Sequence, residues 1–295
     1  MRIPAGQVRL NRRRAVAGAA VLVAGRSPPV VAGQSAWSNP TMIDVGGRHL
    51  AVSCLGAGTP PVLLEAGLTA TGLTWRRAQV GIATFTRACA YDRANLGHSD
   101  PAPGPRTGID AANDLRSLLQ DAGIPAPYVL VGASFGGFVV RLFAAAHPDA
   151  VAGVVLVDAS HEDQVARLAE LLTEEQLADL SFDVPRNIEE MDVKATWDEV
   201  RAAGSLPDVP LIVLSAGLDK PAPPGYPAAE MNQIWRDLQA DLATLSPDSL
   251  HLVIETDHDI ALERPAVVVD AVRRVAEAVW TETPLATPAP VSPRR

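Results

Sequence analysis

The 295-residue sequence lacks three features that would assign the protein to a specialised class. It has no excess of positive charge, because 34 acidic residues outnumber 25 Lys and Arg residues and give a net charge of −9. A nucleic-acid-binding surface needs clustered Lys and Arg, so this balance argues against such a partner. No apolar run is long enough to cross a bilayer. No cluster of His, Cys or carboxylate residues has the spacing of metal ligands, so we expect no metal, and the sequence implies no other cofactor.

Aromatic residues and cysteines are also scarce. Aromatic residues make up 4% of the chain, whereas Ala, Val, Gly, Pro and Arg dominate, which we interpret as coding bias rather than a property of the fold. Apolar residues at 47% and charged residues at 20% are ordinary for a globular enzyme of one large domain. The two cysteines, Cys54 and Cys89, leave a disulfide and two buried free thiols as alternatives.

The two ends of the chain differ from the rest. Five arginines precede an apolar run at residues 15–25, and small residues follow at 31–33. This order predicts an export signal over residues 1–33, with a disordered basic tail as the alternative. Paired arginines before the run suggest the twin-arginine route, so we expect an exported protein with no membrane attachment after signal removal. Residues 281–295 hold four prolines and no apolar periodicity, which predicts a loose tail.

Between these ends, apolar runs typical of strands alternate with stretches of helical periodicity. Strands are expected over residues 41–45, 48–55, 61–65, 87–91, 128–132, 151–158, 209–215 and 250–256. Helices are expected over residues 109–123, 136–147 and 264–280. The later strand runs are apolar nearly throughout, which is typical of strands buried on both faces. The alternation predicts an α/β fold, in which helices cover both faces of a mostly parallel sheet.

The segment over residues 159–208 interrupts this alternation. Its roughly fifty residues contain no strand run, and residues 163–180 have the pattern of a helix. A helical insert of this length at a sheet edge is best explained as a cap over a pocket. We therefore expect a core made of residues 38–158 and 209–280, with a helical cap between its two parts.

The sequence Gly-Ala-Ser-Phe-Gly at residues 132–136 matches the pattern Gly-x-Ser-x-Gly. A sharp strand-to-helix turn holds such a serine in a strained conformation, and side chains two residues to either side would clash. The turn exposes the hydroxyl above the strand ends and aims the first helix amides at the same point. Ser134 is therefore the candidate nucleophile, and a tight turn with an incidental serine is the alternative.

A serine hydroxyl attacks only when a base removes its proton. In α/β enzymes with this motif, the chain order is serine, acid, histidine. His258 follows the last strand run directly and precedes the final helix, so it is the candidate base. Asp158 ends the strand run at 151–158, and Asp219 follows the run at 209–215 by a short loop. Either could hold the imidazole tautomer and stabilise its charged form. We favour Asp219 and keep Asp158 as the alternative acid.

Two backbone amides are candidates for an oxyanion hole. Phe135 follows Ser134 directly, and Leu68 follows Gly67 in the loop after the strand run at 61–65. Each such donor typically supports about 10²–10³ in rate.

Together these residues resemble the α/β-hydrolase superfamily over residues 38–280. The segment CAYDRANLGHSD at 89–100 is similar to the family's strand-four signature, and RPAVVVDAV at 264–272 is similar to its final helix. The resemblance implies an eight-stranded sheet with the nucleophile, acid and base on loops at one edge. It gives Ser134, His258 and the amides of Phe135 and Leu68 the roles stated above. Asp219 matches the usual acid position, and some members use the position of Asp158.

The chain departs from the family pattern at two places. Glu65-Ala66-Gly67 stands where many relatives have His-Gly after the third strand, and Asn95 stands where glycine is common. The family topology also places the second and fourth strands side by side. Because Cys54 and Cys89 lie on those strands, the resemblance implies a disulfide between them.

The resemblance implies a serine hydrolase that cleaves an ester or related acyl bond of a small molecule through an acyl-enzyme. A cofactor-free haloperoxidase could use the same triad, and so could an aminopeptidase with acidic cap residues, for which Glu170, Glu174 and Glu175 are candidates. A ligand-binding sensor with little turnover is an alternative of a different class. Dehalogenases and epoxide hydrolases of the family carry an aspartate at the nucleophile position, so Ser134 argues against both.

Overall fold

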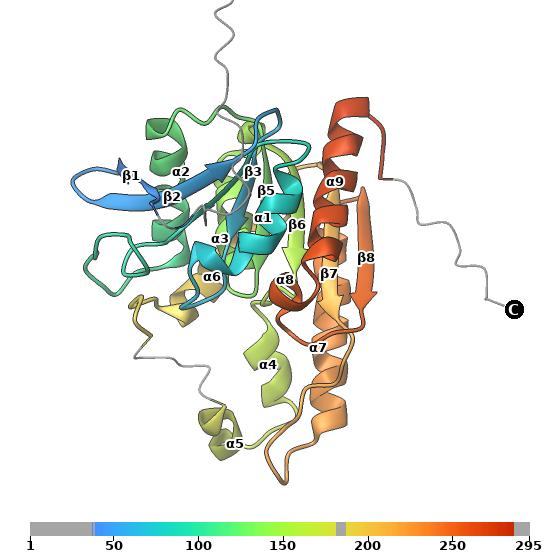
Figure 1. Ribbon diagram of the computed structural model, residues 1–295. Coiled ribbons are helices and arrows are strands. Elements are labelled where there is room, and N and C mark those ends of the chain that lie inside the picture. Colours follow the sequence, from blue (N-terminus) through green and yellow to red (C-terminus); the bar gives the residue numbers. More distant parts are fainter. Residues whose placement is uncertain (1–36, 38, 181–186, 286–295) are drawn as a thin grey trace, which may run out of the picture.

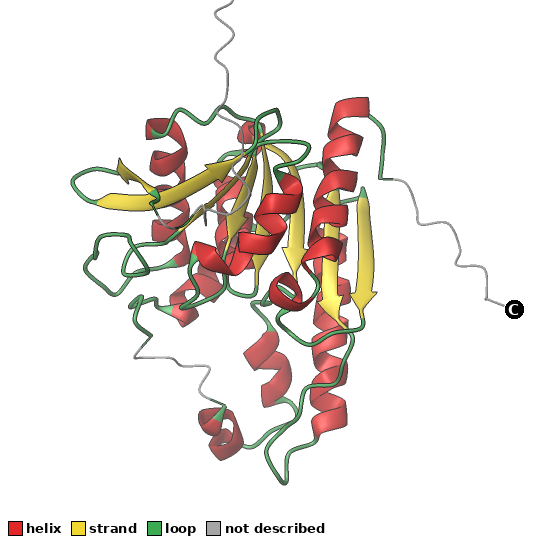
Figure 2. Cartoon of the chain, in the orientation of Figure 1, coloured by secondary structure: helices red, strands yellow, loops and turns green. Residues whose placement is uncertain are grey.

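The computed structural model of the protein describes residues 37, 39–180 and 187–285, drawn in Figures 1 and 2. The expected export signal at 1–33 and the tail beyond residue 285 lie outside the described residues. None of the helices in the described ranges combines the length and apolar character that crossing a bilayer requires.

The described strands form one sheet in the order β1-β2-β4-β3-β5-β6-β7-β8. They are β1 (Thr41–Asp44), β2 (His49–Leu55), β3 (Val62–Glu65), β4 (Ala88–Tyr91), β5 (Tyr128–Ala133), β6 (Val151–Val157), β7 (Leu211–Ala216) and β8 (Ser249–Ile254). β2 is antiparallel to β1 and β4, and all other neighbouring strands are parallel. The predicted eight-stranded, mostly parallel sheet is confirmed.

Two apolar layers enclose this sheet. Along β5, Val129 and Val131 face one layer and Leu130 faces the other, because side chains alternate along a strand. The helices of one layer are α1 (Arg76–Ile82), α8 (Ile260–Glu263) and α9 (Pro265–Thr281), and those of the other are α2 (Gly108–Asp121), α3 (Gly136–Ala146) and α6 (Val193–Ala203). Burial on both faces explains why the central strand runs are apolar throughout.

The cysteines meet across the antiparallel part of the sheet. The register of β2 against β4 pairs Cys54 with Cys89, and the two side chains form a disulfide. The structure thus contains the bond that the family topology implies.

The described parts of the segment between β6 and β7 contain helices joined by loops. The helices are α4 (Gln164–Ala169), α5 (Glu174–Asp179) and α6. The single helix expected over 163–180 is wrong, because Thr173 starts a new helix. The amide of Gln176 donates to the Thr173 hydroxyl, and the Gln176 side chain accepts from the Thr173 amide. In Figure 1, α4 and α5 lie beyond the ends toward which the arrows of β6 and β7 point.

Candidate active site

Ser134 occupies a strained turn between β5 and α3. Its φ of +50° lies in the left-handed region, which residues with a side chain rarely adopt. A Cβ atom at Gly132 would lie 2.6 Å from the carbonyl oxygen of Gly136, and one at Gly136 would lie 2.6 Å from the carbonyl oxygens of Glu65 and Ala66. Both positions therefore require glycine, as the motif predicts.

The chain brings Asp158 and His258 together beside this turn. Ala133 pairs with Val157 in the register of β5 and β6, so Ser134 and Asp158 follow neighbouring positions, on strands about 4.8 Å apart. His258 Nδ1 lies 2.5 Å from Asp158 Oδ2. Within the described residues the Ser134 hydroxyl forms no hydrogen bond of its own. Ser134, Asp158 and His258 thus follow the carboxyl ends of three parallel strands, β5, β6 and β8, at one edge of the sheet.

The carboxylate of Asp158 is fully buried and has four polar contacts. Its Oδ1 accepts hydrogen bonds from the amide of Ala216 at 3.0 Å and the indole of Trp235 at 2.9 Å. Its Oδ2 lies 3.3 Å from the Lys220 ammonium in addition to His258. Burial alone would raise the pKa of Asp158, but the contacts with His258, Lys220 and Ala216 outweigh burial and lower it. The group therefore remains ionised at neutral pH.

Asp219, the acid favoured from the sequence, does not contact His258. Its carboxylate lies 2.6 Å from the guanidinium of Arg236, and the two side chains are 68% and 41% exposed. The reason is the path of the loop after β7, where the amide of Leu218 still pairs with the carbonyl of Thr256 at 3.1 Å. This pairing extends beyond the strand and carries the next residue out to the surface. The alternative acid is the one in contact with the imidazole.

The amides of Leu68 and Phe135 are available to a ligand. Neither donates a hydrogen bond to any part of the chain that the structure describes. A Cβ atom at Gly67 would lie 3.3 Å from the Cβ of Ser134, so the loop that carries Leu68 passes directly beside the serine. Two free amides in this position can stabilise a negatively charged oxygen bonded to carbon.

Comparisons with known proteins agree with this architecture. Residues 60–183 match the model of a family described as alpha/beta hydrolase fold. The chain has the α/β-hydrolase fold. The chain is 34% identical over 165 residues to lipase LipV of Mycobacterium tuberculosis, and the match covers 56% of this chain and 58% of the lipase. The structure of an esterase from Thermogutta terrifontis has the same fold, with a TM-score of 0.57, 24% identity, and coverage of 82% of this chain and 99% of the esterase.

Other relatives are much longer than this chain. The chain is 32% identical over 143 residues to the "Probable transporter efuK" of Hormonema carpetanum, covering 46% of this chain and 20% of that protein. It spans a fifth or less of the length of this and two yeast relatives.

A buried charge network lies at the end of β3, where the chain departs from the family pattern. Arg93 donates to the carboxylates of both Glu65 and Glu189, and all three side chains are at most 4% exposed. The Tyr91 hydroxyl donates to Glu65. Burial raises the pKa of Glu65, although Arg93 and Tyr91 act in the opposite direction. Burial alone would lower the pKa of Arg93, but the two carboxylates raise it, so the guanidinium stays charged.

Three residues at the site were not expected from the sequence. Trp235 lies on α7 (Ala228–Leu242), a helix absent from the predicted elements, and Lys220 precedes that helix. Glu189 lies in the segment between β6 and β7. None of them belongs to a motif, and each reaches the site through tertiary packing, so no local sequence signal marks them.

A cavity of about 190 Å³ adjoins the buried acid. Its lining includes Leu168 of α4, Met231 and Trp235 of α7, and Lys220. Because Trp235 and Lys220 also contact Asp158, this cavity lies next to the candidate acid and between the helices beyond the strand ends.

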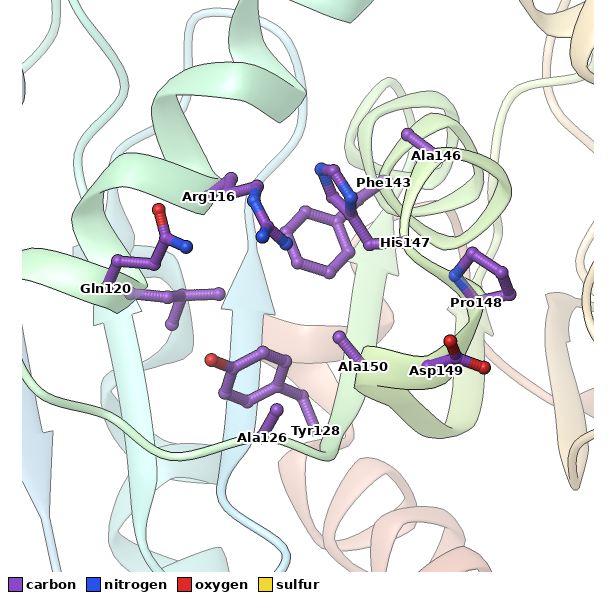
Figure 3. Close-up of a pocket in the computed structure, with 11 residues that line it drawn as sticks. Arg116, Gln120, Ala126, Tyr128, Phe143, Ala146, His147, Pro148, Asp149 and Ala150 are labelled. Atoms are coloured by element: carbon purple, nitrogen blue, oxygen red, sulfur yellow. The ribbon is translucent and has the colours of Figure 1, made fainter.

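A larger pocket lies far from the serine. Its volume is about 430 Å³, and Arg116, Tyr128 and His147 are among its lining residues (Figure 3). Tyr128 begins β5, whereas Ser134 follows the other end of that strand, so about 20 Å of strand separates them. We therefore do not assign this pocket to the site around Ser134. In the described part of the chain, no group of three or more His, Cys, Asp or Glu side chains is placed to hold a metal.

Proposed function

We propose that the protein is a serine hydrolase that cleaves an ester, or a related acyl bond, of a small molecule. The observation that carries this proposal is the 2.5 Å contact of His258 Nδ1 with Asp158 Oδ2, at the strand end next to Ser134. This contact would fix the tautomer that leaves Nε2 as a proton acceptor. The names of two similar proteins, a lipase and an esterase, support acyl transfer as the chemistry.

The proposed reaction has two halves. In the first, Ser134 Oγ attacks the substrate carbonyl carbon while His258 Nε2 takes the hydroxyl proton. The amides of Leu68 and Phe135 stabilise the resulting oxyanion, and Asp158 stabilises the imidazolium. The intermediate collapses, and the alcohol leaves with the proton from His258.

In the second half, water attacks the acyl-enzyme and gives its proton to His258. Collapse of the new tetrahedral intermediate breaks the bond to Ser134 Oγ, returns the proton to that oxygen and releases the carboxylic acid. In this mechanism Asp158 takes the role of the acid in place of Asp219. Its lowered pKa keeps it negative while the imidazole is charged.

The direct test is a panel of p-nitrophenyl esters of graded acyl length, with the Ser134→Ala and His258→Ala variants measured beside the native enzyme. We expect turnover of at least one ester and a fall in kcat of about 10⁴-fold or more in each variant. Turnover that is equal in the native enzyme and Ser134→Ala would contradict the proposal. So would a folded native protein that binds esters without turnover, which is the behaviour of a sensor.

We also infer that the protein is exported through the signal predicted at residues 1–33. The disulfide between Cys54 and Cys89 supports this inference, because such bonds persist mainly in oxidising compartments. Replacement of Arg13 and Arg14 by lysine should retain the protein in the cytoplasm, which cell fractionation measures. Unchanged export of that variant would argue against the twin-arginine route.

A further inference from the structure

We propose that Glu189 is a positioning residue of the oxyanion hole. Together with Arg93, it holds the loop that presents the amide of Leu68 to the site beside Ser134. This inference rests on the proposed hydrolase function and adds a role for the segment between β6 and β7, from which Glu189 comes.

The guanidinium of Arg93 has no free donor. Its Nε and Nη2 bind the two carboxylate oxygens of Glu189 at 2.7 and 2.8 Å. Nη1 donates to Glu65 and, at 2.6 Å, to the carbonyl of Ala66, and Nη2 donates to the carbonyl of Gly67 at 2.7 Å. These five bonds use all five N–H groups of an arginine side chain, so its orientation is fixed.

The bond to the carbonyl of Gly67 sets the direction of the next amide. The peptide bond between Gly67 and Leu68 is trans, so the carbonyl oxygen and the Leu68 N–H point in opposite directions. With the oxygen held by Arg93, the Leu68 N–H points away from the guanidinium. It donates to no described residue, and the Gly67 backbone that precedes it packs against Ser134.

Glu189 also holds the backbone on the other side of Leu68. Its Oε1 accepts a hydrogen bond from the amide of Thr69. Thr69 has a φ of +61°, an unfavourable conformation for a β-branched residue, so the loop needs an external contact to keep it there. Leu68 is thereby fixed from both sides, by the Gly67 carbonyl on Arg93 and by the Thr69 amide on Glu189.

The position of Glu189 is itself secured from the core. The Asn95 side chain donates to the Glu189 carbonyl at 3.0 Å and accepts from the amide of Ala102 at 2.8 Å. Asn95 has a φ of +70°, which accounts for the glycine common at this place in the family. Correct docking of the 187–191 segment and correct direction of the Leu68 amide are therefore coupled through one carboxylate.

The test compares Glu189→Gln and Glu189→Ala with a matched control, Glu162→Gln. Glu162 also makes a bidentate, largely buried pair with Arg141, at 2.6 and 2.7 Å, away from the oxyanion loop. For each variant we would measure kcat and KM for the best ester, the urea unfolding midpoint, and the inhibition constant of a trifluoromethyl ketone. The ketone forms a tetrahedral adduct with a nucleophilic serine, and its oxygen occupies the oxyanion hole.

We expect Glu189→Ala to lower kcat and weaken ketone inhibition in parallel, each by about 10²–10³-fold, with little change in KM. Glu189→Gln should lose less, because its amide oxygen can still accept from Thr69. Glu162→Gln should lose a similar amount of stability and keep native kcat and ketone affinity.

Two results would overturn the inference. One is native kcat and ketone affinity in both folded Glu189 variants, and the other is an equal loss of both quantities in Glu162→Gln. If Glu189→Ala does not fold, the ketone constant of Glu189→Gln decides alone. An absence of Ser134-dependent turnover in the native enzyme would instead refute the proposed function, so the two failures are distinguishable.

Discussion

Asp158 shows how one residue can be both buried and charged. Taking a lone carboxylate out of water is costly, and it is stable here because donors surround both oxygens. An asparagine at this position would place an amide group where Lys220 and His258 now meet an anion. The residue should therefore matter far more for the reaction than its exposed competitor, Asp219.

We predict that Asp158→Asn lowers kcat by about 10⁴-fold, the effect of the same change in serine proteases, because the imidazole loses its tautomer and its counter-charge. Asp219→Asn should leave kcat within about twofold, because its pair with Arg236 is exposed. Steady-state kinetics on a chromogenic ester with both variants makes the comparison. A loss of activity in Asp219→Asn alone would reverse the assignment of the acid.

At the scale of elements, α3 is joined to the chain that follows β6. Arg141 of α3 donates two hydrogen bonds to Glu162, and both side chains are largely buried. Burial alone would raise the pKa of Glu162, but the bonds from Arg141 outweigh it and lower the pKa. The folded protein thus binds the Glu162 proton more weakly than the unfolded chain does.

This difference predicts a pH dependence of stability. A carboxyl group whose pKa falls on folding stabilises the folded protein. This contribution is fully present above the pKa of the unfolded chain, near 4.5 for Glu162, and is lost as the pH falls through the lower pKa of the folded protein. The free energy of unfolding, measured with urea from pH 7 down to pH 3, should therefore decline below about pH 4.5. The decline should be smaller in Glu162→Gln. The same dependence of the free energy of unfolding on pH in this variant and in the native protein would contradict this account.

The sequence was sufficient for the elements whose pattern is local. The strands and the helices over residues 109–123, 136–147 and 264–280 could be predicted because the spacing of apolar residues indicates which side chains are buried. Flanking glycines and prolines indicate where these elements end. The helix over 163–180 was wrong because the cap at Thr173 interrupts an apolar pattern that is otherwise continuous. The helix that carries Trp235 was not predicted.

The candidate site likewise contains some residues that the local sequence predicts and others that it does not. Ser134 follows from a motif, and the place of His258 follows from its position after the last strand. The choice between Asp158 and Asp219 depends on how far pairing continues beyond β7, which composition does not reveal. Glu189 enters the site through tertiary packing alone, so its contacts there follow only from the three-dimensional structure.

At the scale of the whole molecule, the antiparallel edge of the sheet is held covalently. The disulfide links β2 to β4 and closes a loop with a sequence separation of 35. Cross-linking restricts the unfolded chain more than the folded one, so the bond stabilises the fold mainly by raising the free energy of the unfolded state.

We predict that replacing both Cys54 and Cys89 by serine lowers the free energy of unfolding by about 3–4 kcal/mol. Urea unfolding of the variant and the oxidised native protein measures the difference, and the native protein under reductant should behave like the variant. A difference below about 1 kcal/mol would show that the bond contributes little.

The central claim is that Ser134 becomes a nucleophile through His258 and Asp158, and covalent labelling tests it most directly. A fluorophosphonate would be incubated with the native protein, Ser134→Ala and His258→Ala, and the modified peptide located by mass spectrometry. We predict one phosphonate on Ser134, formed in step with the loss of ester turnover, no label in Ser134→Ala and much slower labelling in His258→Ala. Labelling at another residue, or turnover that survives complete modification of Ser134, would contradict the account.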